Sequence, residues 1–125
     1  MSVEIGLKGR AEETVTDANT AQAACSGALP VYGTPFMTAL MEKAAWTSIA
    51  PHLAPGESTV GTAMNITPVG IRVWAESEVT LVDGKRIELK VAAYDQAGKI
   101  GEGTHQRFIV TDDRFLAKAA RKLEG

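Results

Sequence analysis

Apolar residues recur at helical spacing between residues 34 and 49, and from residue 58 onward they alternate with polar residues. The first pattern predicts one long helix. Thr34 can serve as its N-cap, with Pro35 at the first helical position, and Pro51 ends it. Apolar residues lie on nearly all sides of this helix, which is typical of a helix buried in the protein interior.

Four strands are predicted after the helix, over residues 58–66, 71–82, 86–94 and 99–110. Asp83-Gly84 is a strong signal for a two-residue hairpin, and residues 96–98 predict another turn. Such short turns make neighbouring strands antiparallel. The alternation places three sets of side chains inward: Val60, Thr62, Met64 and Ile66; Ile71, Val73, Ala75, Val79 and Leu81; and Ile87, Leu89, Val91 and Ala93.

Shorter elements flank this core. Residues 3–8 alternate and predict a first strand, and residues 13–33 carry the small and turn-forming residues of a loop with one helical turn near residues 20–24. Asp112 or Asp113 can cap a short C-terminal helix whose apolar side carries Phe115, Leu116 and Ala119.

This order of elements predicts an α+β hotdog fold, in which an antiparallel sheet wraps around one long central helix. A helix that is apolar on all sides needs a curved sheet to cover it. The alternative is a helix lying flat on an open sheet, which would leave one helix side exposed. A chain of 125 residues has the length of one ordinary domain, so we expect residues 1–125 to form a single unit.

Composition narrows the function classes. The chain is 45% hydrophobic and 22% charged, as in ordinary globular proteins, and its net charge of −2 argues against a nucleic-acid partner. It has no apolar run long enough for a membrane span, and its first residues lack the apolar core of a signal peptide. One cysteine, Cys25, cannot form an internal disulfide. We therefore expect a cytoplasmic protein with no membrane partner.

Glu42 is the most unusual residue of the predicted helix, because most of its surroundings in the sequence are apolar or small. Two interpretations remain open from the residues alone. In the first, Glu42 and Lys43 form a small solvent-exposed polar patch on the helix. In the second, Glu42 borders an apolar cleft as a partly desolvated carboxylate. Desolvation makes a carboxylate a better base toward water.

Four separated blocks of sequence resemble the fluoroacetyl-CoA thioesterase family. They are GTPFMTALMEKAAW (33–46), PHLAPGESTVGTA (51–63), TPVG (67–70) and GKIGEGTHQRFIV (98–110). The resemblance implies a hotdog homodimer that hydrolyses acyl-CoA thioesters at sites along the dimer interface. It implies no cofactor and no metal, and it leaves any cofactor-binding residues unknown.

The resemblance implies three catalytic residues in this sequence. The family's helix threonine matches Thr34, its glutamate matches Glu42, and the glycine whose amide helps to hold the oxyanion matches Gly61. The family's catalytic histidine matches no residue, because the chain is shorter between Ile66 and Pro68. The sequence therefore predicts an acyl-CoA thioesterase with a reduced catalytic set, and a non-catalytic acyl-CoA binding protein is the alternative.

Each candidate also has a structural interpretation. Thr34 is a common type of helix cap, and Gly61 is a residue that admits close strand packing. His52 and His105 are better explained by structural roles. For the CoA phosphates the candidates are Arg72, Lys85, Arg86 and Arg107, or these side chains simply keep a strand edge solvated.

The acyl group is a separate question. The family's aromatic lid position falls on Ala28, so fluoroacetyl specificity is not expected. Two further functions are less favoured. A hotdog dehydratase pairs a histidine with an acid in a motif that is not visible here, and a dimerisation module has no need of Glu42.

Overall fold

In the computed structural model, residues 2–66 and 72–124 are described. Five strands, two helices and two 3₁₀ turns follow one another in an order close to the predicted one. They are β1 (Lys8–Thr14), η1 (Asp17–Asn19), α1 (Thr34–Ile49), η2 (Ala50–His52), β2 (Glu57–Ile66), β3 (Arg72–Asp83), β4 (Arg86–Asp95), β5 (Gly98–Thr111) and α2 (Asp112–Glu124). The predicted inward residue Ile71 lies outside the described residues.

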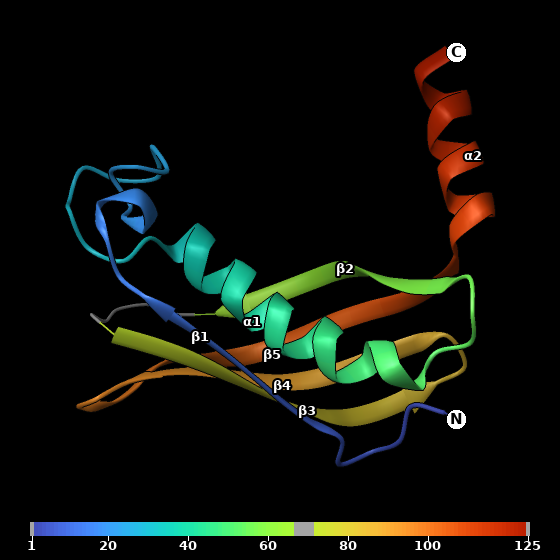
Figure 1. Cartoon of the computed structure of the whole chain (residues 1–125), viewed down its shortest axis with the longest axis horizontal. Helices are drawn as coiled ribbons and strands as arrows, with labels where there is room; N and C mark the ends of the chain where they lie inside the picture. The colour runs from blue at the N-terminus through green and yellow to red at the C-terminus, as the bar shows by residue number, and fades with distance from the viewer. Residues whose placement is uncertain (1, 67–71, 125) are drawn as a thin grey trace.

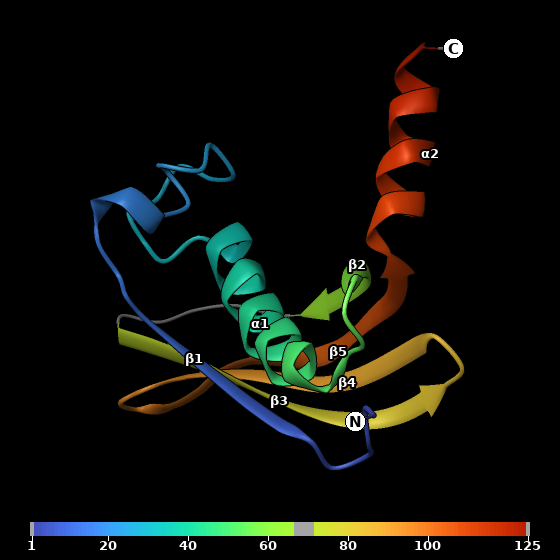
Figure 2. The ribbon, with the colours of Figure 1, turned by 45° about the vertical axis from the view of Figure 1, so that its right-hand side comes forward.

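The five strands form one antiparallel sheet in the order β1-β3-β4-β5-β2. The sheet curls around α1, while α2 projects away from the sheet (Figure 1, Figure 2). This arrangement confirms the predicted hotdog fold. The hairpin between β3 and β4 turns at Gly84 with a φ of +60°, a backbone conformation that glycine adopts without strain.

The core lies between one side of α1 and the concave face of the sheet. Its helix contribution is Met37, Leu40, Met41, Ala44, Ala45 and Ile49, and its strand contribution includes Val73, Ala75, Val79, Ile87, Leu89, Val91 and Ala93. Burying one such large side chain stabilises a fold by about 1.5–3 kcal/mol. The inward sets predicted for β3 and β4 are thus largely confirmed.

One side of α1 is open within the single chain, which corrects the prediction of a helix buried on all sides. Ala39 and Lys43 are exposed, and Trp46 retains 46% of its accessible surface. The physical reason is geometric, because a five-stranded sheet reaches around only part of the helix circumference. The helix side that one chain leaves open, with Trp46 on it, is therefore available for a further contact.

The predicted first strand over residues 3–8 is wrong. Gly6 has a φ of +93°, which interrupts extended backbone, and Ile5 is 70% exposed. Val3 and Leu7 still pack against the core from an irregular segment. The strand itself begins at Lys8 and pairs with β3.

Tyr32 holds the loop before α1 by one contact to β1 and one contact within the loop. The Tyr32 hydroxyl donates to Oε2 of Glu13 at 2.5 Å, and Tyr32 forms an isolated bridge with Thr20. Burial raises the pKa of Tyr32, so the hydroxyl keeps the proton it donates. The predicted helical turn is present, since Ala24 N donates to Thr20 O at 3.0 Å.

These anchors fix where α1 begins. Gly33 occupies the N-cap position and its N–H donates to Asn19 O at 2.9 Å, so Thr34 is the first helical residue. The predicted capping role of Thr34 is therefore wrong by one position. Among the described residues the Thr34 hydroxyl has no hydrogen-bond partner, and the residue is exposed.

Candidate active site

Four residues from three elements meet on the concave side of the sheet. Glu42 comes from the middle of α1, Gly61 from β2, and His105 and Arg107 from β5. Arg107 Nη1 lies 3.2 Å from Oε2 of Glu42 and 3.2 Å from Nε2 of His105. The structure therefore brings together two of the three predicted catalytic residues with two that the sequence assigned to structural or CoA-binding roles.

A bulge in β2 makes this meeting possible. Gly61 pairs with Arg107 and Ala63 pairs with Gln106, so Thr62 is an extra residue in the ladder. The extra residue reverses the alternation. A side chain at Gly61 would point at Glu42, so Gly61 faces α1, and the exposed Thr62 does not.

The predicted inward face of β2 is consequently wrong for its first half. Val60 and Thr62 were expected to face the core, but they precede the reversal of side-chain direction. Met64 and Ile66, after the bulge, pack against the core as expected. Strict alternation in the sequence cannot reveal a bulge, because the extra residue leaves no gap in the chain.

Every nitrogen of the Arg107 guanidinium has a hydrogen-bond partner within the protein. Nε donates to Thr59 Oγ1 at 2.8 Å, Nη2 donates to Thr59 O at 2.8 Å, and Nη1 reaches Glu42 and His105. Its side chain is 7% exposed, whereas that of Glu42 is 38% exposed. Burial lowers the pKa of Arg107, and the charge of Glu42 opposes that shift.

This pairing corrects two expectations. The surroundings of Glu42 are not purely apolar, because a buried cation fixes its carboxylate while part of it stays accessible. Arg107 is not a free phosphate ligand, because its donors are engaged inside the protein. Of the other basic candidates, Arg86 is paired with Glu88 at 3.2 Å, and the side chain of Arg72 lies outside the described residues.

His105 is 2% exposed and has one protonation pattern that satisfies its neighbours. Its Nδ1 lies 2.9 Å from Ala63 O, an acceptor, so Nδ1 carries the proton. Its Nε2 faces a guanidinium that only donates, so Nε2 is unprotonated. Burial is the main cause that lowers the pKa of His105, and the nearby Arg107 charge acts in the same direction.

A pH-dependent stability follows from the lowered pKa of His105. The unfolded chain takes up a proton near pH 6.5, the ordinary value, while the folded state resists protonation until lower pH. The unfolded state therefore binds more protons in this window, and the free energy of unfolding falls as pH drops below about 6.5. The expected slope from this group is at most about 1.4 kcal/mol per pH unit.

Urea unfolding at several pH values between 7.5 and 5 measures this contribution. His105→Gln lacks the titrating group, so its unfolding free energy is expected to change less over the same range. The groups facing the imidazole are Glu42 on α1, the Ala63 carbonyl on β2, Arg107 on β5 and the apolar Leu89 on β4. Equal pH slopes for wild type and variant would contradict a histidine held neutral by burial.

Gly61 lets the carboxylate of Glu42 pack against the backbone of β2. A Cβ at this position would lie 2.5 Å from Oε2 of Glu42 and 3.3 Å from Cε1 of His105. No side chain fits there without moving the carboxylate. The glycine thus helps to fix the carboxylate, while the Glu42 side chain stays 38% exposed.

Thr34 is not brought into this cluster. It lies at the exposed first position of α1, eight residues before Glu42, or about 12 Å along the helix axis. In the described part of the chain no hydrogen bond joins Thr34 to Glu42 or Gly61. The structure therefore places Glu42 beside Gly61 and Thr34 apart from them, and the catalytic roles of all three residues stay predictions.

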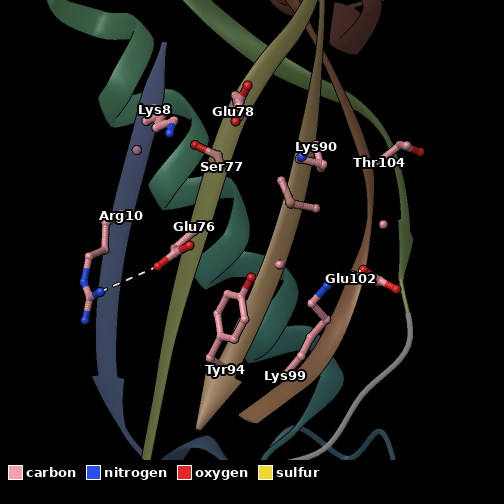
Figure 3. A pocket seen from close by; sticks show the side chains of 14 residues that line it. Lys8, Arg10, Glu76, Ser77, Glu78, Lys90, Tyr94, Lys99, Glu102 and Thr104 are labelled. Atoms are coloured by element: carbon pink, nitrogen blue, oxygen red, sulfur yellow. Dashed lines mark hydrogen bonds and ion pairs between the residues drawn. The ribbon is translucent and has the colours of Figure 1, made fainter. Parts of the chain in front are cut away.

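Two hollows have different relations to this cluster. One of about 330 Å³ lies beside the second half of α1 and is lined in part by Trp46, Thr59 and Arg107. A larger one, about 750 Å³, lies on the sheet face turned away from α1, where side chains such as Arg10, Glu76 and Tyr94 surround it (Figure 3). The larger hollow contains none of the cluster residues, and size alone does not make it the site.

Comparison with known proteins identifies the family. Residues 15–113 match the family model described as fluoroacetyl-CoA-specific thioesterase. The chain belongs to this family. The fluoroacetyl-CoA thioesterase of Streptantibioticus cattleyicolor is 39% identical to the chain over 97 residues, which are 74% of this chain and 70% of that protein. Membership in a thioesterase family supports hydrolysis of acyl-CoA thioesters as the type of reaction.

Solved structures of thioesterases agree with this assignment. The fluoroacetyl-CoA thioesterase FlK superposes with a TM-score of 0.90 at 30% identity, with 98% of each chain covered. A thioesterase superfamily member from Thermus thermophilus superposes with a TM-score of 0.89 at 27% identity, covering 98% of this chain and 94% of its own. This chain therefore shares the hotdog fold of these two thioesterases along nearly its whole length.

Two further predictions concern the stretch after Ile66 and the possibility of a membrane-spanning helix. The predicted shortening between Ile66 and Pro68, and with it the predicted lack of a match to the family's histidine, falls in part on residues outside the described ranges. No helix in the described residues has the length and apolar character needed to cross a membrane.

Proposed function

We propose that this family member hydrolyses small acyl-CoA thioesters as a homodimer, with Glu42 as the reactive carboxylate. The observation that carries the proposal is the geometry around Glu42. Arg107 holds one oxygen of the carboxylate, Gly61 lets it pack against β2, and the Glu42 side chain is still 38% exposed. A positioned carboxylate that a small molecule can reach is what water activation or direct attack on a thioester requires.

In this proposal the thioester carbonyl lies against the Gly61 amide, beside Glu42. A backbone N–H aimed at the carbonyl oxygen stabilises the negative charge that develops there. Glu42 then removes a proton from the attacking water, or it attacks the carbonyl itself to form an anhydride that water opens. Both routes end with a free carboxylic acid and CoA thiol.

The homodimer is supported by the open side of α1 and the position of β2 at the sheet edge. Trp46 is exposed on that helix side, and β2 has a neighbour on only one flank. A second copy covering this region would close the space around Glu42. It also offers a way for Thr34 to take part, because a substrate lying along the subunit seam can span the distance between Thr34 and Glu42.

The absent histidine sets the expected level of activity. Loss of a general acid–base group typically costs about 10²- to 10⁴-fold in rate. A CoA thiolate is a good leaving group, so hydrolysis can continue slowly without an acid to protonate it. We therefore propose a slow thioesterase. A small acyl or aryl group is proposed as its substrate in place of fluoroacetyl, because the family's lid position holds Ala28.

The experiment that tests this proposal measures free CoA thiol released from acetyl-, propionyl-, butyryl- and benzoyl-CoA by wild-type protein. Hydrolysis of at least one ester above the rate without protein is expected. The shortened chain favours one other candidate, a non-catalytic acyl-CoA binding protein. That protein would be thermally stabilised by the esters without releasing thiol. Absence of both thiol release and stabilisation would contradict both functions.

A further inference from the structure

Beyond Glu42 and Gly61, the cluster contains a buried histidine for which the proposed reaction assigns no step. We propose that His105 is a positioning residue, which holds Arg107 against Glu42 by accepting a hydrogen bond from the guanidinium. The expected effect of His105 on kcat rests on the proposed function, whereas its hydrogen bond to Arg107 does not. It gives a role to a residue that the sequence assigned to structure alone.

The role of His105 follows from the direction of its two hydrogen bonds. Nδ1 donates to Ala63 O at 2.9 Å, and this bond fixes the ring plane against β2, just after the bulge. Nε2 then presents its lone pair to Arg107 Nη1 at 3.2 Å. A histidine in this state is an acceptor toward Arg107, because the donor position is already used.

The Nε2 atom of His105 completes the set of hydrogen-bond partners around the Arg107 guanidinium. Thr59 accepts from Nε and Nη2 and so holds the other side of the guanidinium. The Nη1 edge points into the protein, and its partners are Glu42 and His105. Removing the imidazole acceptor would leave a buried N–H of a charged group without a partner, which favours a shift of the guanidinium. Glu42 would then lose its fixed orientation.

The same geometry excludes His105 as a replacement for the absent catalytic histidine. An acid that protonates the CoA thiolate must have a proton to donate and access to the leaving group. His105 is 2% exposed, its only proton is bonded to Ala63, and its free nitrogen faces a cation. Its effect on catalysis is therefore exerted through Arg107 and Glu42.

Two substitutions of His105 each keep the hydrogen bond of only one ring nitrogen. The amide of Gln can place an oxygen near the position of Nε2, which keeps an acceptor for Arg107. The amide of Asn can place its NH₂ near the position of Nδ1, which keeps the donor to Ala63 and removes the acceptor. His105→Asn is expected to lower kcat by about 10- to 100-fold, because misplacing a reacting group costs rate on this scale.

His105→Gln is expected to retain kcat within about threefold of wild type, with KM changed little in both variants. A purely structural histidine would change the stability of the two variants without giving their kcat values this ranking. Equal losses of kcat, or a wild-type kcat for His105→Asn, would overturn the proposal.

A second measurement keeps the proposal testable if a variant does not fold. The ¹⁵N chemical shifts of the wild-type imidazole report its tautomer, and the proposal requires a neutral ring with its proton on Nδ1 at pH 7. A proton on Nε2 would overturn the positioning role. Inactive wild-type protein with the expected tautomer would instead count against the thioesterase proposal and leave the hydrogen-bond assignment intact.

Discussion

Glu42→Gln is expected to lower kcat for CoA-ester hydrolysis by about 10²- to 10⁴-fold, the usual cost of removing a group that transfers protons. The amide has nearly the size of the carboxylate and can still accept the hydrogen bond from Arg107 Nη1. It can neither take a proton from water nor attack a thioester. Because the shape of the site is retained, KM is expected to change much less than kcat.

Glu102→Gln is the matched control for this variant. Glu102 lies on β5 with 65% of its side chain exposed, on the sheet face turned away from α1 (Figure 3), so the same change from glutamate to glutamine does not touch the cluster. Thiol release by Glu102→Gln is expected to match wild type, measured under saturating ester. An equal fall for both variants, or full activity of Glu42→Gln, would show that the carboxylate is not the reactive group.

Gly61→Ala is expected to lower kcat by about 100-fold, because its methyl group meets the carboxylate. The added Cβ would lie 2.5 Å from Oε2 of Glu42 and 3.5 Å from Arg107 Nη1. The carboxylate must turn away, and a displacement of about 1 Å in a catalytic group can cost this much rate. The contact involves the far end of a flexible side chain, so the melting temperature is expected to change little.

Thr62→Ala provides the comparison within the same bulge. Thr62 is exposed and bonds Gln106 O across the ladder at 3.1 Å, so its loss perturbs β2 without entering the cluster. Its kcat is expected to stay near that of wild type, followed by thiol release together with thermal melting. A Gly61→Ala protein with wild-type kcat would mean that the position of the Glu42 carboxylate against Gly61 is not needed for the reaction.

The fold was accessible from the sequence because its strongest signals are local. The helical spacing from Met37 to Ile49 and the prolines that follow it define α1, and the alternation over residues 86–94 defines β4. The first strand was misplaced because Val3 and Leu7 bury part of their surface without forming a strand. Alternating apolar and polar residues indicate which side chains are buried, and a side chain can be buried without its backbone forming a strand.

The candidate site was only partly accessible for a related reason. Glu42 is conspicuous within its helix, but its partners come from strands far away in the sequence. Whether Gly61, His105 and Arg107 face α1 depends on the register between β2 and β5 and on the bulge at Thr62. His105 and Arg107 do share one strand face in the sequence, since they are two residues apart. That spacing is the signal that would have found them, once the inward face of β5 was known.

The most direct test of the account is a crystal structure of Glu42→Gln protein with an intact small acyl-CoA ester. We expect the thioester carbonyl carbon to lie about 3–3.5 Å from the side chain at position 42, or from a water that this side chain holds, which is the distance of a group ready to react. We also expect the carbonyl oxygen near the Gly61 amide, in a groove between two subunits. An ester bound on the outer sheet face of Figure 3, or a position 42 in open water remote from any subunit contact, would contradict it.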